Sequence, residues 1–199
     1  MKNIWDTRYA SEEFVYGKEP NAYFASQLAL LRPGKLLLPG EGEGRNAVHA
    51  ASGDWMVEAF DQSRVAAEKA LAYAAEKGLR LEYRVSGIEE FAFQADTYDA
   101  AGLIYVHAPP PQRKLLHSKV VESLKPGGRV ILEAFHVSQL GNNTGGPANP
   151  ELLLTEEIIR SDFTGLEQIS LEQNRVILEE GAFHRGEAEV IRYVARKTQ

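Results

Sequence analysis

The segment from Leu36 to Asn46 constrains the fold of this chain more than any other stretch. Its apolar residues 36–38 are typical of a buried strand, and glycines follow at positions 40, 42 and 44. Glycine lets the backbone turn sharply and lets a ligand approach it closely. A second apolar run, residues 55–60, ends at Asp61, at roughly the separation that places a carboxylate under a ribose in a doubly wound sheet. The pattern predicts a strand–turn–helix unit that binds an adenosine-containing cofactor.

Short apolar runs alternate with helix-like segments along most of the chain. The expected strands are residues 35–38, 55–60, 81–85, 98–106 and 129–135. The expected helices are residues 23–31, 44–51, 63–78, 112–124 and 155–163. Two further expected strands, 166–178 and 187–196, have a short link and are therefore antiparallel. We predict an α/β fold, namely a doubly wound (Rossmann-like), mostly parallel seven-stranded sheet with an antiparallel C-terminal hairpin.

Length and composition indicate one globular domain over residues 1–199, with 1–34 as an N-terminal lid segment and 35–199 as the cofactor-binding core. The net charge of −6 disfavours nucleic acid as a partner. Because the chain has no cysteine, disulfides, thiolate zinc sites and cysteine nucleophiles are excluded. No apolar stretch reaches the ~18 residues of a membrane span, and the start of the chain is polar. We expect a cytoplasmic monomer or homodimer without a membrane partner or a bound metal.

The residues of the glycine turn favour one class of cofactor over another. In a dinucleotide fingerprint, G-x-G-x-x-G counted from Gly40, the third glycine falls on Arg45, which is too large for close helix–strand packing. Glu41 and Glu43 would repel a pyrophosphate but suit a cation. S-adenosylmethionine carries an adenosine, a sulfonium and an ammonium, and it has no phosphate. It is the expected cofactor, and an NAD(P)-dependent oxidoreductase is the first alternative.

Several motifs together resemble the class I S-adenosylmethionine-dependent methyltransferases, in particular the bacterial branch that includes tellurite-resistance and thiopurine-methyltransferase-like proteins. They are Trp5-Asp6-x-Arg8-Tyr9, Tyr16-Gly17-x-x-Pro20-Asn21, Gly40 to Ala47, Asp61-Gln62-Ser63, Leu124 to Gly128, Gly141 to Pro147 and Gly181-x-x-His184-x-Gly186. The resemblance implies methyl transfer to a small-molecule acceptor, with a thiol or an oxyanion of selenium or tellurium as candidates. A catalytically idle protein that binds a nucleoside or S-adenosylmethionine is the second alternative.

The expected cofactor site combines the glycine turn with the ends of the next two strands. Asp61 is expected to accept hydrogen bonds from the ribose, Arg8 to bind the methionine carboxylate, and Glu41 or Glu43 to face the cationic groups. Gly87 stands where many members of the resembled family have an acidic residue near the adenine amino group, so the backbones of Gly87 and Ile88 are expected to recognise adenine. The cofactor-binding residues predicted in full are Arg8, Gly40, Glu41, Gly42, Gly44, Asn46, Asp61, Gln62, Gly87 and Ile88.

The expected reacting groups follow the fourth strand and precede the last one. Tyr105 and His107 are expected on the floor of the pocket, where His107 orients or deprotonates the nucleophile. The alternative for His107 is a loop histidine bonded to the backbone. His184 and Arg185 are expected to bind an anionic substrate, and their alternative is a polar hairpin turn. The N-terminal aromatic residues and the loop 136–150 are expected to close over the cofactor.

Overall fold

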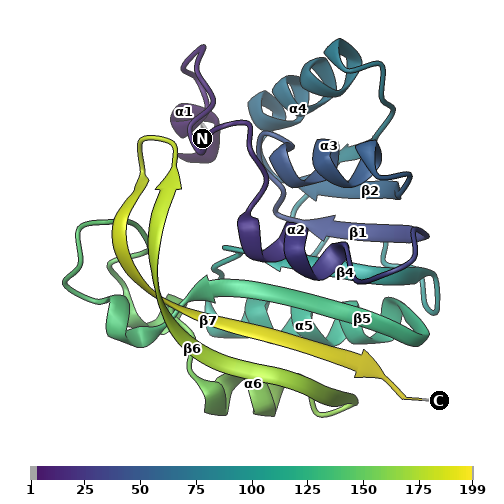
Figure 1. Ribbon diagram of the computed structural model, residues 1–199, viewed down its shortest axis with the longest axis vertical. Coiled ribbons are helices and arrows are strands. Elements are labelled where there is room, and N and C mark those ends of the chain that lie inside the picture. Colours follow the sequence, from purple (N-terminus) through teal and green to yellow (C-terminus); the bar gives the residue numbers. More distant parts are fainter. Residues whose placement is uncertain (1–3, 199) are drawn as a thin grey trace.

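The computed structural model describes residues 4–198 and contains a seven-stranded sheet of order β3-β2-β1-β4-β5-β7-β6 (Figure 1). The first three residues of the predicted lid segment and Gln199 lie outside this description. The strands are β1 (Lys35–Pro39), β2 (Met56–Asp61), β3 (Glu82–Val85), β4 (Tyr98–Ile104), β5 (Leu124–Phe135), β6 (Leu166–Glu180) and β7 (His184–Lys197). The helices are α1 (Ile4–Arg8), α2 (Ala22–Leu28), α3 (Arg45–Ser52), α4 (Arg64–Glu76), α5 (Pro110–Ser123) and α6 (Glu156–Asp162), with single 3-10 turns η1 (Val137–Gln139) and η2 (Pro150–Leu152).

The pairing of the strands confirms the predicted fold class. Strands β1 to β5 run parallel, β7 is antiparallel to β5, and β6 is antiparallel to β7. The register Leu36↔Val57 and Leu36↔Ala100 places β1 at the centre of the parallel part. The carboxyl ends of the parallel strands therefore meet at one edge of the sheet.

Side chains alternate between the two faces of the sheet, and each face is covered by helices. Leu36 and Leu38 of β1 pack in one cluster with Phe24 of α2 and residues of α3. Leu37 belongs to the cluster on the other face, with residues of α5 and α6. Since fully burying a leucine is worth about 1.5–3 kcal/mol, shifting the register of β1 by one residue would be strongly unfavourable.

Local backbone chemistry explains where some elements begin and end. The Ser63 hydroxyl caps α4 by accepting from the Ala66 N–H at 3.1 Å, as the sequence predicts. The predicted fourth strand is two residues too long, because Tyr105 has a positive φ of 54° and ends β4 at Ile104. Helix α1 was not predicted, and β5 begins at Leu124 rather than at Arg129.

The long C-terminal hairpin reaches the same edge of the molecule as the N-terminal segment (Figure 1). The Ala182 N–H in its turn donates to the Val15 carbonyl at 3.2 Å. Segments from the two ends of the sequence thus enclose the carboxyl ends of the parallel strands. None of the helices within residues 4–198 has both the length and the apolar character that a membrane crossing requires.

Candidate functional site

The glycine turn after β1 places one glycine at a cavity and another between two helices. Gly40 has a φ of +60° and lines the cavity. Gly44 has a φ of +88°, and a Cβ there would lie only 2.6 Å from the Cβ of Ala70 in α4. Gly44, and not the position of Arg45, is therefore the residue that must be small for the glycine turn to pack closely against α4. Gly42 and Gly44 shape the turn but do not line the cavity.

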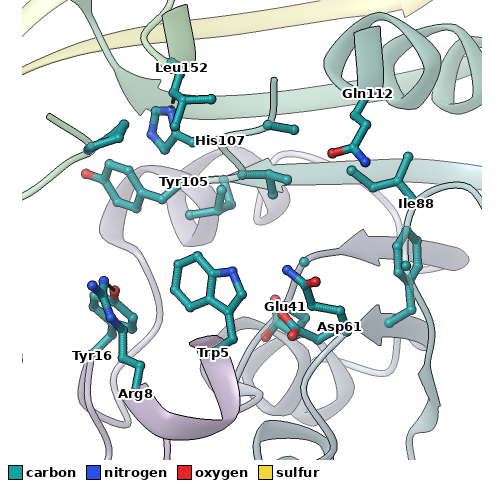
Figure 2. A pocket seen from close by; sticks show the side chains of 18 of the residues that line it. Trp5, Arg8, Tyr16, Glu41, Asp61, Ile88, Tyr105, His107, Gln112 and Leu152 are labelled. Carbon is teal, nitrogen blue, oxygen red and sulfur yellow. Dashed lines mark hydrogen bonds between the residues drawn. The ribbon is translucent and has the colours of Figure 1, made fainter. Parts of the chain in front are cut away.

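A single cavity of about 730 Å³ runs along the carboxyl ends of the strands (Figure 2). Its lining residues follow one another in the order of the strands in the sheet. Gly87 follows β3, Asp61 ends β2, Gly40 follows β1, Tyr105 follows β4, and His184 begins β7. The structure brings most of the predicted cofactor residues together here. They are Arg8, Gly40, Glu41, Asn46, Asp61, Gln62, Gly87 and Ile88.

The carboxylate of Asp61 is fixed by two backbone amides at the edge of this cavity. Its Oδ2 accepts from the Gly42 N–H at 3.1 Å, and its Oδ1 accepts from the Ser63 N–H at 2.8 Å. Burial raises the pKa of Asp61 above its usual value. Each carboxylate oxygen keeps a further lone pair, so the group can also accept hydrogen bonds from a ligand's hydroxyls.

Glu41 occupies the place at which an α-helix usually binds an anion. Its Oε1 accepts from the Ala47 N–H in the first turn of α3 at 2.7 Å. A phosphate would have to displace this carboxylate, so the turn is unsuited to a dinucleotide and suits a cationic ligand without phosphate. Burial raises the pKa of Glu41 to about 7.

Glu43 does not line the cavity, whereas Glu41 does. Of the two glutamates that were expected to face the cofactor, only Glu41 is therefore in a position to do so. The Oε2 of Glu43 accepts from the Val15 N–H at 2.7 Å, and its other oxygen pairs with Lys69 of α4. Glu43 thereby attaches the N-terminal segment to α4, and it is 4% exposed.

Arg8 is the last residue of α1, and its guanidinium lines the part of the cavity that the N-terminal segment covers (Figure 2). It lies 5.1 Å from the ring centroid of Trp5 and 5.2 Å from that of Phe183, and its Nη1 donates to the Tyr16 hydroxyl at 3.1 Å. No aspartate or glutamate within residues 4–198 forms an ion pair with it. It is therefore available to bind a carboxylate of a ligand.

The hydrogen bonds of His107 disfavour the part of its predicted role in which it deprotonates the nucleophile. Its Nδ1 lies 2.7 Å from the Leu152 carbonyl, and its Nε2 accepts from the Phe135 N–H at 3.3 Å. Both ring nitrogens are engaged, and burial lowers the pKa of His107 to about 4. The residue is the backbone-bonded loop histidine of the alternative interpretation, and it lines the cavity as a neutral ring.

Tyr105 also cannot act as a base. Its hydroxyl donates to Glu133 Oε1 at 2.9 Å, and burial raises its pKa well above the usual value. Its positive φ turns the chain away from β4 so that Val106 and His107 continue along the cavity. Tyr105 forms part of the wall and holds Glu133.

His184 is the histidine that the structure equips to accept a proton. Its Nδ1 lies 3.1 Å from Glu180 Oε2, which Arg45 also contacts at 3.0 Å. Although burial opposes it, the hydrogen bonds from His184 and Arg45 hold the pKa of Glu180 at about 2, so Glu180 is ionised and Nδ1 carries the proton. Burial lowers the pKa of His184, and its Nε2 has no hydrogen-bond partner among the described residues.

Aromatic rings surround this histidine on the cavity side. The ring centroids of Tyr16 and Tyr105 each lie 4.6 Å from that of His184, and that of Phe135 lies 5.2 Å away. Arg185 is different, because it does not line the cavity and instead borders a groove at the hairpin tip. The structure therefore does not bring Arg185 and His184 together in one site, because neighbouring residues of a strand point to opposite faces.

Sequence reasoning missed the side chains that hold His184 in place. The Asn21 amide donates from Nδ2 to Glu180 Oε1 at 3.0 Å and to Glu133 Oε1 at 2.6 Å. Glu133 in turn accepts from Arg192 at 2.6 Å. The spacing of four residues between Glu180 and His184 was the one signal in the sequence that could have suggested the pair.

Comparison with known proteins agrees with this geometry. Residues 37–128 match the family described as Methyltransferase domain. That segment begins in β1 and includes the glycine turn, Asp61, Gly87 and His107. No curated protein sequence matches the chain significantly.

Solved structures with the same fold cover nearly the whole chain. TehB from Haemophilus influenzae has 16% identity and a TM-score of 0.75 over 90% of this chain and 63% of its own. A methyltransferase from Methanosarcina mazei described as S-adenosylmethionine-dependent has 17% identity and a TM-score of 0.71, over 90% of this chain and 99% of its own. A protein studied for the conversion of a disulfide bond into a thioacetal group during echinomycin biosynthesis has 18% identity and a TM-score of 0.75, over 98% of this chain and 91% of its own.

Proposed function

We propose that this protein, a methyltransferase whose cofactor is S-adenosylmethionine, acts on a small molecule held at the β5–β7 end of its cavity. The observation that carries the proposal is the single cavity that runs from Asp61 to His184. At about 730 Å³ it lies within the range of ligand pockets, about 300–1,000 Å³. The cofactor and the acceptor would lie side by side in it.

The β1–β3 end of the cavity would hold the cofactor. Asp61 would accept from the ribose hydroxyls, Gly40 would allow close approach to the backbone, and Glu41 would face the positive charge. Arg8 would bind the methionine carboxylate with its unpaired guanidinium. When bound, S-adenosylmethionine supplies a methyl group on a positively charged sulfur.

The β5–β7 end would receive the acceptor. There Tyr16, Tyr105 and Phe135 form apolar walls, and His184 presents its Nε2 lone pair. Glu180 stabilises the protonated ring, so His184 would take the proton of an acceptor O–H or S–H group. Holding the nucleophile about 3–3.5 Å from the methyl carbon and excluding water would supply much of the rate enhancement.

The pair of His184 and Glu180 favours an acceptor that must lose a proton before it reacts. Among such acceptors, a thiol is acidic enough to need the least assistance from a base. Oxyanions of selenium and tellurium need no base, and for them the supporting observation is the resemblance of the motifs to the tellurite-resistance branch. The acidic composition and the size of the cavity support a small molecule rather than a nucleic acid or a membrane as the partner. We propose that the protein acts in the cytoplasm as a monomer or homodimer.

The test joins a binding measurement to an acceptor screen. Calorimetric titration is expected to show binding of S-adenosylmethionine and none of NADH; tight NADH binding alone would overturn the proposal. Release of S-adenosylhomocysteine is then measured with a panel of thiols, phenols, selenite and tellurite.

A variant separates the acceptor end from the cofactor end in the same assay. His184→Asn is expected to reduce turnover of thiols and phenols about 100-fold or more while S-adenosylmethionine affinity stays unchanged. Arg185→Ala is the matched control. Binding of the cofactor without turnover of any compound would instead support the idle binding protein.

A further inference from the structure

Arg45 connects the glycine turn to the histidine at the other end of the cavity. It is the first residue of α3, directly after Gly44, and its side chain is only 9% exposed. Its Nη1 donates to the Tyr16 carbonyl at 3.3 Å, and its Nη2 donates to Glu180 Oε2 at 3.0 Å. The residue that is too large for a dinucleotide fingerprint therefore reaches from the cofactor turn to the acceptor end.

One carboxylate oxygen serves both Arg45 and His184. The Oε2 of Glu180 accepts from Arg45 and also lies 3.1 Å from His184 Nδ1. The other oxygen, Oε1, accepts from the Asn21 amide at 3.0 Å. The side chains of Glu180 and His184 are 15% and 8% exposed, so water screens these charges only weakly. A guanidinium and an imidazole thus share one largely buried carboxylate.

The two charges act on His184 in opposite directions. A buried carboxylate beside a histidine favours the protonated ring, which has no lone pair left to accept a proton. The positive charge of Arg45 disfavours the protonated ring and also offsets the charge of Glu180. Because arginine stays protonated throughout the physiological pH range, this opposition is permanent. The His184 ring is therefore neutral before the acceptor arrives, and its Nε2 keeps a lone pair.

The other titratable groups near His184 do not replace Arg45. They are Tyr16, Tyr105, His107, Arg8 and the ion pair of Glu133 with Arg192. The two tyrosines and His107 carry no charge at neutral pH. Arg8 also disfavours the protonated ring, but Glu180 forms its ion pairs with Arg45 and His184. Arg45 is thus the cation that directly opposes the carboxylate beside His184.

We propose that Arg45 keeps His184 in its neutral, proton-accepting form by offsetting the charge of Glu180, and that it thereby sets the lowest pH at which the acceptor is methylated. Arg45 is a positioning residue, because it acts through Glu180 and His184 and not on the reacting atoms. The proposal rests on the proposed function, in which His184 is the base. It also gives a reason for an arginine where a dinucleotide fingerprint has its third glycine.

The test follows the protonation of His184 directly, by NMR titration of the imidazole signals of the cofactor-free protein. The chain has five histidines, and His184→Asn identifies the relevant signal. In Arg45→Gln the titration midpoint of His184 is expected at least about one pH unit above that of the wild type. Arg45→Lys, which keeps the positive charge, is expected to restore at least half of the difference. Arg185→Gln is the matched control, because it removes the neighbouring arginine outside the cavity and should leave the midpoint unchanged.

A double variant avoids the unpaired carboxylate that Arg45→Gln leaves behind. In Arg45→Gln combined with Glu180→Gln both charges are absent, and the His184 midpoint is expected within about half a pH unit of the wild type. A midpoint about one pH unit or more below the wild type would show that Arg45 does not offset Glu180. That result, or an unchanged midpoint in Arg45→Gln, would overturn the proposal.

The pH dependence of turnover connects the midpoint to the reaction. With the thiol or phenol that the wild type methylates fastest, Arg45→Gln is expected to move the acidic limb of kcat upward by the same interval as the NMR midpoint. Its rate should approach the wild-type rate at higher pH. A rate lowered equally at every pH would indicate a merely structural role and would overturn the proposal. If the midpoint moves as expected but the wild type methylates no compound, the proposed function fails while the effect of Arg45 on His184 is supported.

Discussion

The two ends of the cavity are built by different means. At the β1–β3 end, backbone amides hold the carboxylates: Asp61 contacts Ser63 two residues away and Gly42 nineteen residues away, and Glu41 contacts Ala47 six residues away. At the β5–β7 end, side chains distant in sequence hold one another: Asn21 and Glu180 are 159 residues apart. The separation between Arg45 and Glu180 is 135 residues.

This difference predicts different responses to mutation. A carboxylate held by backbone amides depends on the shape of one turn, so the turn is the sensitive point. A network of buried side chains depends on every member, because removing one partner leaves the others unsatisfied. The β1–β3 end is therefore expected to be most sensitive to changes in its backbone, and the β5–β7 end to changes in its charged side chains.

The largest expected effect is at the helix contact of the glycine turn. Gly44→Ala adds a Cβ 2.6 Å from that of Ala70 at a positive φ, so we expect a loss of about 4 kcal/mol in unfolding free energy. Cofactor affinity should fall with it. Gly78→Ala is the control, because Gly78 has a φ of +70° but nothing within 4 Å, and it should cost only about 1 kcal/mol. Equal losses in urea denaturation would contradict the packing argument.

The corresponding change at the other end is Asn21→Asp. It keeps the acceptor that caps α2 at Phe24 but places a third carboxylate beside Glu133 and Glu180. We expect a loss of about 3 kcal/mol in stability and a larger drop in turnover than in cofactor affinity. Asn21→Ser, which also caps α2 but adds no charge, should lose less. Turnover and affinity that fall in parallel would remove the distinction between the two ends.

Asp61→Ala tests the β1–β3 end without altering its glycines. Cofactor affinity is expected to fall by about 1–3 kcal/mol, because the ligand hydroxyls and the Gly42 amide lose their acceptor. Asp61→Asn, which retains one oxygen, should lose less. An unchanged dissociation constant in calorimetry would exclude Asp61 from the site.

The pH dependence of cofactor binding should also come from the β1–β3 end. Below a pKa of about 7, free Glu41 is protonated, and a cationic ligand favours the ionised form. The affinity for S-adenosylmethionine should therefore rise about tenfold between pH 6 and pH 8. Since the pKa is raised on folding, ionisation of Glu41 also lowers the stability of the free protein as the pH rises from about 4.5 to 7.

A variant and a second ligand isolate this effect. Glu41→Gln should flatten the profile, and S-adenosylhomocysteine, which lacks the sulfonium charge, should show a weaker dependence. Glu180, with a pKa of about 2, stays ionised throughout this range and contributes nothing to it. A profile that Glu41→Gln leaves unchanged would place its origin elsewhere.

The smallest effect is expected for Arg185→Ala. Its side chain lies outside the cavity, so stability, affinity and turnover should all stay within about 0.5 kcal/mol of the wild type. A loss of turnover in this variant would return Arg185 to the substrate site.

The parts that sequence patterns predicted well are those with short-range causes. The glycine turn, the position of Asp61 and the Ser63 cap follow from patterns over a few residues, and the structure has them after β1, at the end of β2 and at the start of α4, as predicted. Sequence patterns could not decide between Glu41 and Glu43 or predict the contacts of His107 and Arg185, because each of these side chains has several partners within reach. The choice among them depends on strands and loops that come together only in the folded chain.

Local sequence patterns were sufficient to predict the parallel sheet, the seven strands and the turn that suits a cationic ligand without phosphate. Alternation of apolar residues and turn chemistry act over a few residues, so they can be recognised in one dimension. Which histidine keeps an unbonded ring nitrogen, and which glutamate of the glycine turn faces the cavity, depended instead on the folded chain. Those outcomes depend on where segments distant in sequence meet in space. Their hydrogen bonds occupy both ring nitrogens of His107 but leave Nε2 of His184 without a partner among the described residues.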